Sequence, residues 1–456
     1  MSIILGSHAC NREFHSIFDA SKMLSPCASA GRWLTFSHLV PIMKKIDAKR
    51  RAVCKRMRER NGRRIFYGLF LFSLVFSAVL LARTRGAGLH AFLYEDATEL
   101  FSDFINNLHY PTHDGGPYFD SIWATFPPLA YTLYYLCDVA LTRAVYPFEI
   151  LAYTVITSLT CMLLLYGVQR LFARRCRRAY RSGEPALLSL CLLLSGVMIY
   201  TIERGNSVLN VMVMLLLALE LRDSREAWKR EAALLLIAVA AGFKIYPCVF
   251  GLLYVFEKRW KETVRLLIYG VALFFVPFAW FSGAEGFKQF LYNHQEIQTM
   301  VRDDYLTSIP SVLGFIGAEA GWPAQKVSLL SKVLSLLAGA AMLSCICLEK
   351  RLWLRTLLMV SLFTLVPGWN AEYMAVYMIL PFVLCYLDAG EEKAFPVYMA
   401  LFACVFILLP FGADLGWHKQ TSWNMLVSFG AIYGLTLMGM ADAVVAFARR
   451  RAVAKA

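Results

Sequence analysis

Long apolar runs with few or no charged residues are the feature that most constrains this chain of 456 residues. Hydrophobic residues make up 58% of it, and several runs reach about 17–25 residues, which is long enough to cross a bilayer as helices. Only helices and closed barrels satisfy their backbone groups in lipid, and these runs lack the alternation of barrel strands. We therefore predict an all-α polytopic membrane protein.

The apolar runs and the polar connectors between them predict a topology with both termini in the cytoplasm. This topology needs 127–145 to be a short juxtamembrane helix that makes no crossing. It also needs 231–256 to be a re-entrant hairpin of two half-helices, with Gly242 and Pro247 breaking the helix at the tip "GFKIYP". We expect about ten transmembrane helices, near residues 65–83, 148–170, 186–201, 207–222, 263–282, 327–348, 351–367, 371–389, 394–411 and 424–447.

Positive charge is unevenly distributed along the chain, whose net charge is +14. Residues 1–64 hold 14 Lys and Arg against 4 Asp and Glu, and 170–181 ("RLFARRCRRAYR") holds six Arg. Basic blocks beside apolar spans mark the cytoplasmic side and attract anionic lipid, so membrane lipid rather than nucleic acid is the expected partner.

The same topology divides the chain into a basic cytoplasmic segment and three further parts. These are 65–282 with a first outer loop at 83–126, a second outer loop at 283–326, and C-terminal transmembrane helices over 327–456. The first outer loop holds six acids, and all five His beyond residue 64 fall in outer segments. Titratable chemistry is therefore expected on the outer face of the membrane.

"ELFSDFINN" in the first outer loop places Glu99 and Asp103 four residues apart, on one face of a helix. Two close carboxylates can act as a base or hold a cation. The alternative is a solvated loop helix with scattered acids. Further along, "FPPLAY" fixes a rigid start to an aromatic helix, where Tyr131 is either an interfacial anchor or part of a groove for a lipid substrate.

"IERGNSVLN" lies where one helix ends and the next begins. Glu203 and Arg204 could pair with each other, Gly205 permits a tight turn, and Asn206 is a plausible N-cap. An anionic group could instead sit at this helix start beside Arg204.

"AAGFKIYP" indicates a functional site more strongly than the motifs above, because Lys244 is a charge within an apolar stretch. Charges at membrane depth are costly and mark functional sites, and a phosphate is the simplest partner. His294 and Arg302 in the second outer loop could serve as a base, a cationic clamp or solvated loop residues. Trp369 and Asn370 in "PGWNAEY" could stack on a sugar or anchor the interface.

The chain has no phosphate-cradling Gly-rich loop or nucleotide fingerprint. A nucleotide-driven pump is therefore disfavoured, and any donor is expected to arrive already activated, from the membrane.

An ordered set of short motifs gives the chain a family resemblance. "DF" in the first outer loop is followed by "PY", "FPPLAY", "RGN", and "KIYP" with "EKRWK" after it. This set resembles glycosyltransferase family 87, the polyprenol-phosphate-sugar-dependent enzymes of the GT-C superfamily. The resemblance covers about 95–265 and is only generic from 283 onward. It implies a GT-C fold with an outward-facing site that moves a sugar, of the mannose type, to a hydroxyl of a lipid-linked or surface glycan.

The resemblance also implies roles for single residues. Asp103 matches the loop acid proposed as the catalytic base of an inverting transfer, with Glu99 as the second acid. The departing phosphate needs cationic stabilisation, for which Lys244, Arg204 and then Arg302 are candidates. The substrate-binding candidates are Asn206, Tyr246 of "KIYP", His294, Trp369, Asn370 and Tyr131.

The family tends to place a His in a late outer loop, where this chain has "PGWNAEY" instead, and His294 could substitute for it. We expect no cofactor. A divalent cation held by Glu99 and Asp103 is an alternative that we do not favour, because a donor with one phosphate needs no cation to hold a diphosphate. The expected location is the cell inner membrane. The alternative function is a flippase or transporter of lipid-linked glycans, but such a protein is expected to show an internal repeat, and none is evident.

Overall fold

The computed structural model describes residues 36–86, 93, 100–113, 115–139, 146–175, 183–299, 306–368, 370–388, 394–412 and 422–455. The chain divides into two compact units. One comprises Met1–Gly68 with Asp388–Ala400, and the other comprises Leu69–Leu387 with Leu401–Ala456. The second unit carries both cavities of the candidate site.

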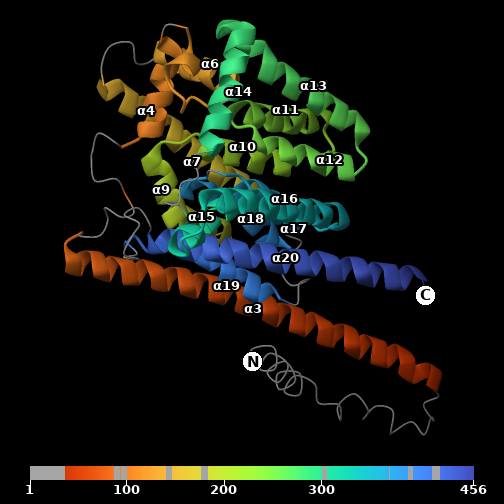
Figure 1. Ribbon diagram of the computed structural model, residues 1–456. Coiled ribbons are helices and arrows are strands. Elements are labelled where there is room, and N and C mark those ends of the chain that lie inside the picture. Colours follow the sequence, from red (N-terminus) through yellow and green to blue (C-terminus); the bar gives the residue numbers. More distant parts are fainter. Residues whose placement is uncertain are drawn as a thin grey trace. The chain divides into compact units, whose positions relative to one another are not determined.

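The described residues form helices and no strand apart from one isolated bridge between Gly412 and Ser422 (Figure 1). The first half of the chain contains α3 (Phe36–Thr84), α4 (Ser102–His109), η3 (Tyr110–Thr112), α5 (Pro117–Asp120), α6 (Pro128–Cys137), α7 (Tyr146–Arg175), α8 (Glu184–Leu193), α9 (Gly196–Arg204), α10 (Val208–Leu221) and α11 (Ala227–Phe243). The second half contains η5 (Tyr246–Gly251), α12 (Leu252–Phe256), α13 (Trp260–Phe275), η6 (Val276–Trp280), α14 (Gly283–Thr299), α15 (Ile309–Glu319), α16 (Ala324–Leu348), α17 (Leu352–Leu365), η7 (Glu372–Met378), α18 (Ile379–Leu387), α19 (Phe395–Val405) and α20 (Trp423–Lys455).

An all-helical polytopic membrane protein is confirmed, but the predicted count of ten spans is not. Among the described residues, 5 helices are long and apolar enough to cross a membrane, or up to 6 if α8 and α9, bent by 56°, form one span. Several predicted spans fall on shorter helices, such as α10 with 14 residues and α17 with 14 residues. Most residues of both helices are buried in protein.

The helix break predicted in "GFKIYP" lies at Lys244, where α11 ends in extended backbone before the 3₁₀ helix η5. Pro247 lies in the first turn of η5. Gly242, predicted to be a breaker, is instead helical. A Cβ at Gly242 would lie 2.5 Å from Leu129 Cδ2, so this glycine allows α6 to pack closely on α11.

The Pro-Pro pair starts α6 within the predicted juxtamembrane segment. Pro127 is the N-cap and Pro128 is the first helical residue, a position where the missing N–H costs nothing. The helix has only 10 residues, too few to cross a bilayer core. It packs against both α4 and α11, so it supports the short helix α4.

Helix α3 runs without a break through the predicted boundary at residue 64. It has 49 residues, which corresponds to about 74 Å at 1.5 Å per residue. Its Ala52–Thr84 portion is one of the candidate spans. The boundary at 64 is thus a change of charge within one helix.

Gly205 makes the turn that joins α9 to α10. Its φ of +71° is the left-handed conformation that favours glycine, and a Cβ there would lie 2.9 Å from the α-carbon of Phe101. The N–H of Phe101 donates to the carbonyl of Glu203 at 2.9 Å. The turn is therefore in direct backbone contact with the residue that precedes α4.

We predict that Gly205→Ala destabilises this unit by about 1–3 kcal/mol through backbone strain and the clash with Phe101. Thermal unfolding in detergent measures the effect as a lower Tm. Gly183→Ala is the matched control, because a Cβ at Gly183 meets nothing within 4 Å. Equal Tm values for the two variants would contradict the role given to the turn.

Candidate active site

Asp103 on α4 is held by the turn between α9 and α10. Arg204 Nη2 donates to Asp103 Oδ1 at 2.7 Å, and Asn206 Nδ2 donates to Asp103 Oδ2 at 2.7 Å. The Arg204 and Asp103 side chains are only 13% and 19% exposed, so this ion pair is shielded from water. The sequence predicted that Arg204 could pair with its neighbour Glu203, and the structure shows it paired with Asp103 from a distant segment.

Asn206 performs two tasks at once. Its Oδ1 accepts from the N–H of Val208 at 3.2 Å, so it satisfies a free donor at the start of α10. The N-cap position itself is Ser207, one residue later than predicted. With the oxygen fixed by the helix, the amide nitrogen of Asn206 is aimed at Asp103.

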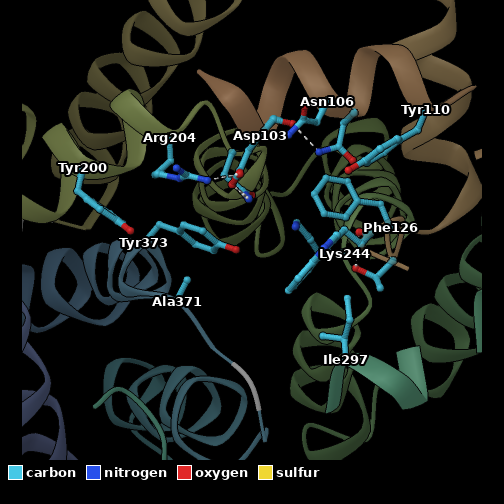
Figure 2. Close-up of a pocket in the computed structure, with 14 residues that line it drawn as sticks. Asp103, Asn106, Tyr110, Phe126, Tyr200, Arg204, Lys244, Ile297, Ala371 and Tyr373 are labelled. Atoms are coloured by element: carbon cyan, nitrogen blue, oxygen red, sulfur yellow. Dashed lines mark hydrogen bonds and ion pairs between the residues drawn. The ribbon is translucent and has the colours of Figure 1, made fainter. Parts of the chain in front are cut away.

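A polar cavity of about 300 Å³ opens beside Asp103. Figure 2 shows Asp103, Arg204, Lys244 and Tyr373 around it. The cavity thus collects side chains from residues 103–126, the α9–α10 turn, the end of α11 and the segment before α18. Its lining residues are Asp103, Asn106, Asn107, Tyr110, Trp123, Thr125, Phe126, Tyr200, Arg204, Asn206, Lys244, Ile297, Ala371 and Tyr373.

Lys244 lies in the turn after α11, outside the candidate spans. Its Nζ is 3.3 Å from the centre of the Phe126 ring, a distance at which the ring face attracts a cation. Burial lowers the pKa of Lys244 to about 7, although the negative charge of Asp103 opposes the shift. Near pH 7 the side chain is therefore divided between its amine and ammonium forms, and the amine gains a proton when an anion binds beside it.

A second cavity of about 260 Å³ shares Thr125, Phe126, Lys244, Ile297 and Tyr373 with the polar cavity. Its lining is mostly apolar. The remaining residues that line it are Pro127, Ile245, Tyr246, His294, Phe363, Pro367, Asn370 and Met374. Lys244 therefore stands in the wall between a polar and an apolar compartment.

His294, Tyr246 and Asn370, predicted as substrate-binding, line this second cavity. Burial and then the charge of Lys244 lower the pKa of His294, so its imidazole is neutral at pH 7. The Tyr246 hydroxyl is 3.1 Å from that of Tyr377. Asn370 is used structurally, because its side chain donates to the Thr364 carbonyl and its own carbonyl accepts from Thr307.

Tyr131, also predicted to bind substrate, lines neither cavity. Tyr131 is fully buried and packs edge-on against Tyr118, and its hydroxyl accepts from the Phe126 N–H at 3.5 Å. It is part of the aromatic packing beneath the loop. Glu99, Arg302 and Trp369 lie outside the described residues.

Aromatic residues that the sequence did not single out form part of the wall of the polar cavity. Trp123, Tyr110 and Tyr200 line the polar cavity, and Trp123 is 39% exposed. The sequence feature that could have predicted this role of Trp123 is the presence of a tryptophan in a polar loop. Its partly exposed ring presents an apolar face to whatever enters the cavity.

Asn293 on α14, also missed, fixes that wall. It has no exposed surface, and its Nδ2 donates to the carbonyls of Tyr118 at 2.9 Å, Ser121 at 3.1 Å and Ala124 at 3.3 Å. The two N–H bonds of one amide are thus shared among three carbonyls of the segment that carries Trp123. Only the fold brings these residues together, since they are about 170 positions apart.

Among the described residues, no group of three or more His, Cys, Asp or Glu is arranged to hold a metal ion. Each oxygen of Asp103 already accepts from a cationic or amide donor. The site geometry offers one carboxylate, one lysine and a neutral imidazole, which suits proton transfer and anion binding.

We predict that Asn293→Leu costs about 1–3 kcal/mol, because buried carbonyls lose their donor. Protease cleavage within 115–125 should become faster, and Tm should fall. Gln295→Leu on the same helix is the control, since Gln295 is exposed. Unchanged cleavage in Asn293→Leu would show that the aromatic wall does not depend on this amide.

The model of glycosyltransferase family 87 matches residues 124–369, which is more than half of the chain. Arg204, Asn206, Lys244 and His294 lie within the matched region, whereas Asp103 precedes it. No curated protein matches the chain.

Proposed function

Because the chain belongs to glycosyltransferase family 87, we propose that sugar transfer takes place in the polar cavity beside Asp103. The donor is a polyprenyl-phosphate sugar of the mannose type, and the acceptor is a hydroxyl of a lipid-linked or surface glycan. The observation that carries this proposal is that Asp103 and Lys244, a carboxylate and a cation, line the same cavity. Family membership also favours a transferase over the transporter alternative.

The proposed step is an inverting displacement. The acceptor hydroxyl gives its proton to Asp103 while its oxygen bonds to the anomeric carbon. The bond from that carbon to the phosphate oxygen breaks, and polyprenyl phosphate leaves with the electron pair. A carboxylate has about four lone-pair sites, so Asp103 can accept this proton while bound to Arg204 and Asn206.

Lys244 stabilises the leaving phosphate in this proposal, as a fixed cation at the point where negative charge develops. Arg204, first considered for the phosphate, is assigned to orienting Asp103, because its guanidinium is 2.7 Å from that carboxylate. Neutral His294 and Tyr246 in the second cavity are proposed to contact the phosphate or the lipid's first carbons. No metal ion takes part in this mechanism.

The site is proposed to face away from the cytoplasm. Helix α10 begins at the Asn206 side of the cavity and ends at Arg222, which joins Asp223, Glu257 and Arg259 in a cluster of ion pairs. Basic clusters favour the cytoplasmic side. The opposite end of the helix, with the cavity, then lies at the outer side of the inner membrane.

We predict that Asp103→Asn lowers kcat by about 10²–10⁴-fold, the usual contribution of a general base. The assay mixes purified enzyme in nanodiscs with a labelled polyprenyl-phosphate mannose and membrane extract as the source of acceptor. Release of polyprenyl phosphate is the readout. Asp120→Asn is the matched control, because Asp120 lies in the same loop, faces His113 at 3.6 Å and lines neither cavity.

Wild-type turnover in Asp103→Asn would rule out the base assignment. Absence of release from the wild type, with mannose, glucose and arabinose donors and extract present, would rule out the proposed donor class.

We predict that donor affinity falls as the pH rises above about 7, the pKa of Lys244 in the empty site. Below this pH Lys244 is charged and attracts phosphate. Above it, binding must take up a proton, so KM for the donor rises by up to about tenfold per pH unit. Lys244→Arg should remove this dependence, because arginine stays charged. The same slope in both enzymes would show that Lys244 is not the titrating group.

A further inference from the structure

Glu372 is a buried carboxyl group that the proposed mechanism does not use. It is only 3% exposed and lies at the start of η7. Its Oε1 accepts from Asn424 Nδ2 at 2.8 Å, and the Ser422 side chain forms a further hydrogen bond with the same carboxyl group. No lysine, arginine or histidine in the described part of the chain forms an ion pair with it. Burying an acid away from any cation is costly, so we expect this acid to have a role beyond packing.

Asn424, in the first turn of α20, connects Glu372 to two other parts of the fold. It has no exposed surface, and its Oδ1 accepts from the N–H of Leu409 at 3.3 Å. A Cβ at Gly196, the first residue of α9, would collide with this same oxygen. The other end of α9 leads into the turn that holds Asp103. The pair of Glu372 and Asn424 therefore lies where η7, α9 and α20 meet.

The residues on both sides of Glu372 line the candidate active site. Ala371 lines the polar cavity, and Tyr373 lines both the polar and the second cavity, as Lys244 does. Figure 2 shows the Tyr373 hydroxyl directed into the polar cavity, on the side where Asp103 and Lys244 lie. Because Tyr373 is only 7% exposed and directly follows Glu372, the anchoring of Glu372 limits where this hydroxyl can move.

We propose that Glu372 is a positioning residue that acts through Tyr373. The Tyr373 hydroxyl contacts the reacting group in the space between Asp103 and Lys244. This inference rests on the proposed function and adds one contact residue and its anchor to it. A phenol hydroxyl can donate a hydrogen bond to an oxygen on which negative charge develops. Such a donor stabilises a transition state best when buried neighbours hold it in place beforehand, which is the role of Glu372 and Asn424.

The test is a double-mutant cycle on kcat. Tyr373→Phe removes only the hydroxyl group, and Glu372→Leu removes the anchor while it fills much of the same space. Both single variants and the double variant are assayed in nanodiscs with the labelled donor and membrane extract described above. Tyr433→Phe is the matched control, because Tyr433 is a half-buried tyrosine on α20 that lines neither cavity.

Each single variant should lower kcat by about 10²-fold, the usual loss when one fixed donor is removed. The double variant should lose no more than the weaker of the two single variants, because both substitutions remove the same interaction. Losses that multiply in the double variant would overturn the proposal, since Glu372 would then act independently of Tyr373. Wild-type kcat in Tyr373→Phe would also overturn it.

Glu372→Gln separates a hydrogen-bonded anchor from one that depends on charge. Glutamine keeps an oxygen that can accept from Asn424, so kcat should stay within about threefold of the wild-type value. A loss as large as that of Glu372→Leu would contradict anchoring through this hydrogen bond. If Glu372→Leu does not fold, the cycle is run with Asn424→Ser, whose shorter side chain no longer reaches Glu372.

A second measurement does not depend on transfer activity. Fluorotyrosine incorporated in place of Tyr373 reports the surroundings of the ring through its fluorine NMR resonance. The resonance should be narrow and unchanged in Glu372→Gln, and it should shift or broaden in Glu372→Leu. Fluorotyrosine in place of Tyr433 is the control and should give the same resonance in all three backgrounds.

An unchanged Tyr373 resonance in Glu372→Leu overturns the positioning role and leaves the proposed reaction standing. A shifted or broadened resonance supports the positioning role even if no enzyme shows transfer, in which case only the proposed reaction fails.

Discussion

The ion pair between Asp103 and Arg204 is the interaction on which the candidate site depends. It joins the short helix α4 to the turn between α9 and α10, and both side chains are mostly buried. Charge-assisted bonds of this kind are about twice as strong as neutral ones. Arg204 and Asn206 flank Gly205, and the left-handed glycine lets both side chains reach the same carboxylate. The turn therefore helps to fix the orientation of α4, together with the packing of α4 on α6.

Lys244 lies between two adjoining cavities that differ in the polarity of their lining residues. Its ammonium lies over the Phe126 ring, with polar side chains on one side and apolar ones on the other. A charge at such a boundary separates a compartment suited to a sugar from one suited to hydrocarbon. The end of α11 provides the position, because the helix stops at Phe243 and the following residue is extended.

The sequence predicted the helical membrane fold, the break near Lys244 and the turn at Gly205. Each of these is a local signal, such as a charge in an apolar run or a glycine between helices. The predicted count of ten spans is not confirmed, because hydropathy measures composition and does not distinguish burial in protein from exposure to lipid. Helix α17, buried along nearly its whole length, has the same composition as a span.

The partners within the site were harder to predict because they are made by tertiary contacts. Arg204 had a neighbouring acid in sequence, yet it pairs with Asp103 from about 100 positions away. Gly242 was taken for a helix breaker, whereas the fold uses its small size for close packing with Leu129. Asn293 gave no local signal in the sequence, because its side chain acts by donating hydrogen bonds to three carbonyls of a distant loop.

Two parts of the polar cavity's lining are anchored by separate parts of the fold. Asp103 is fixed by the α9–α10 turn, whereas the segment carrying Trp123 is fixed by Asn293 on α14. The surface that would meet the acceptor can therefore change in sequence while the carboxylate keeps its orientation. Divergence of acceptor preference among related chains would then proceed by exchanging loop residues between Ser121 and Thr125, with the reacting group left in place.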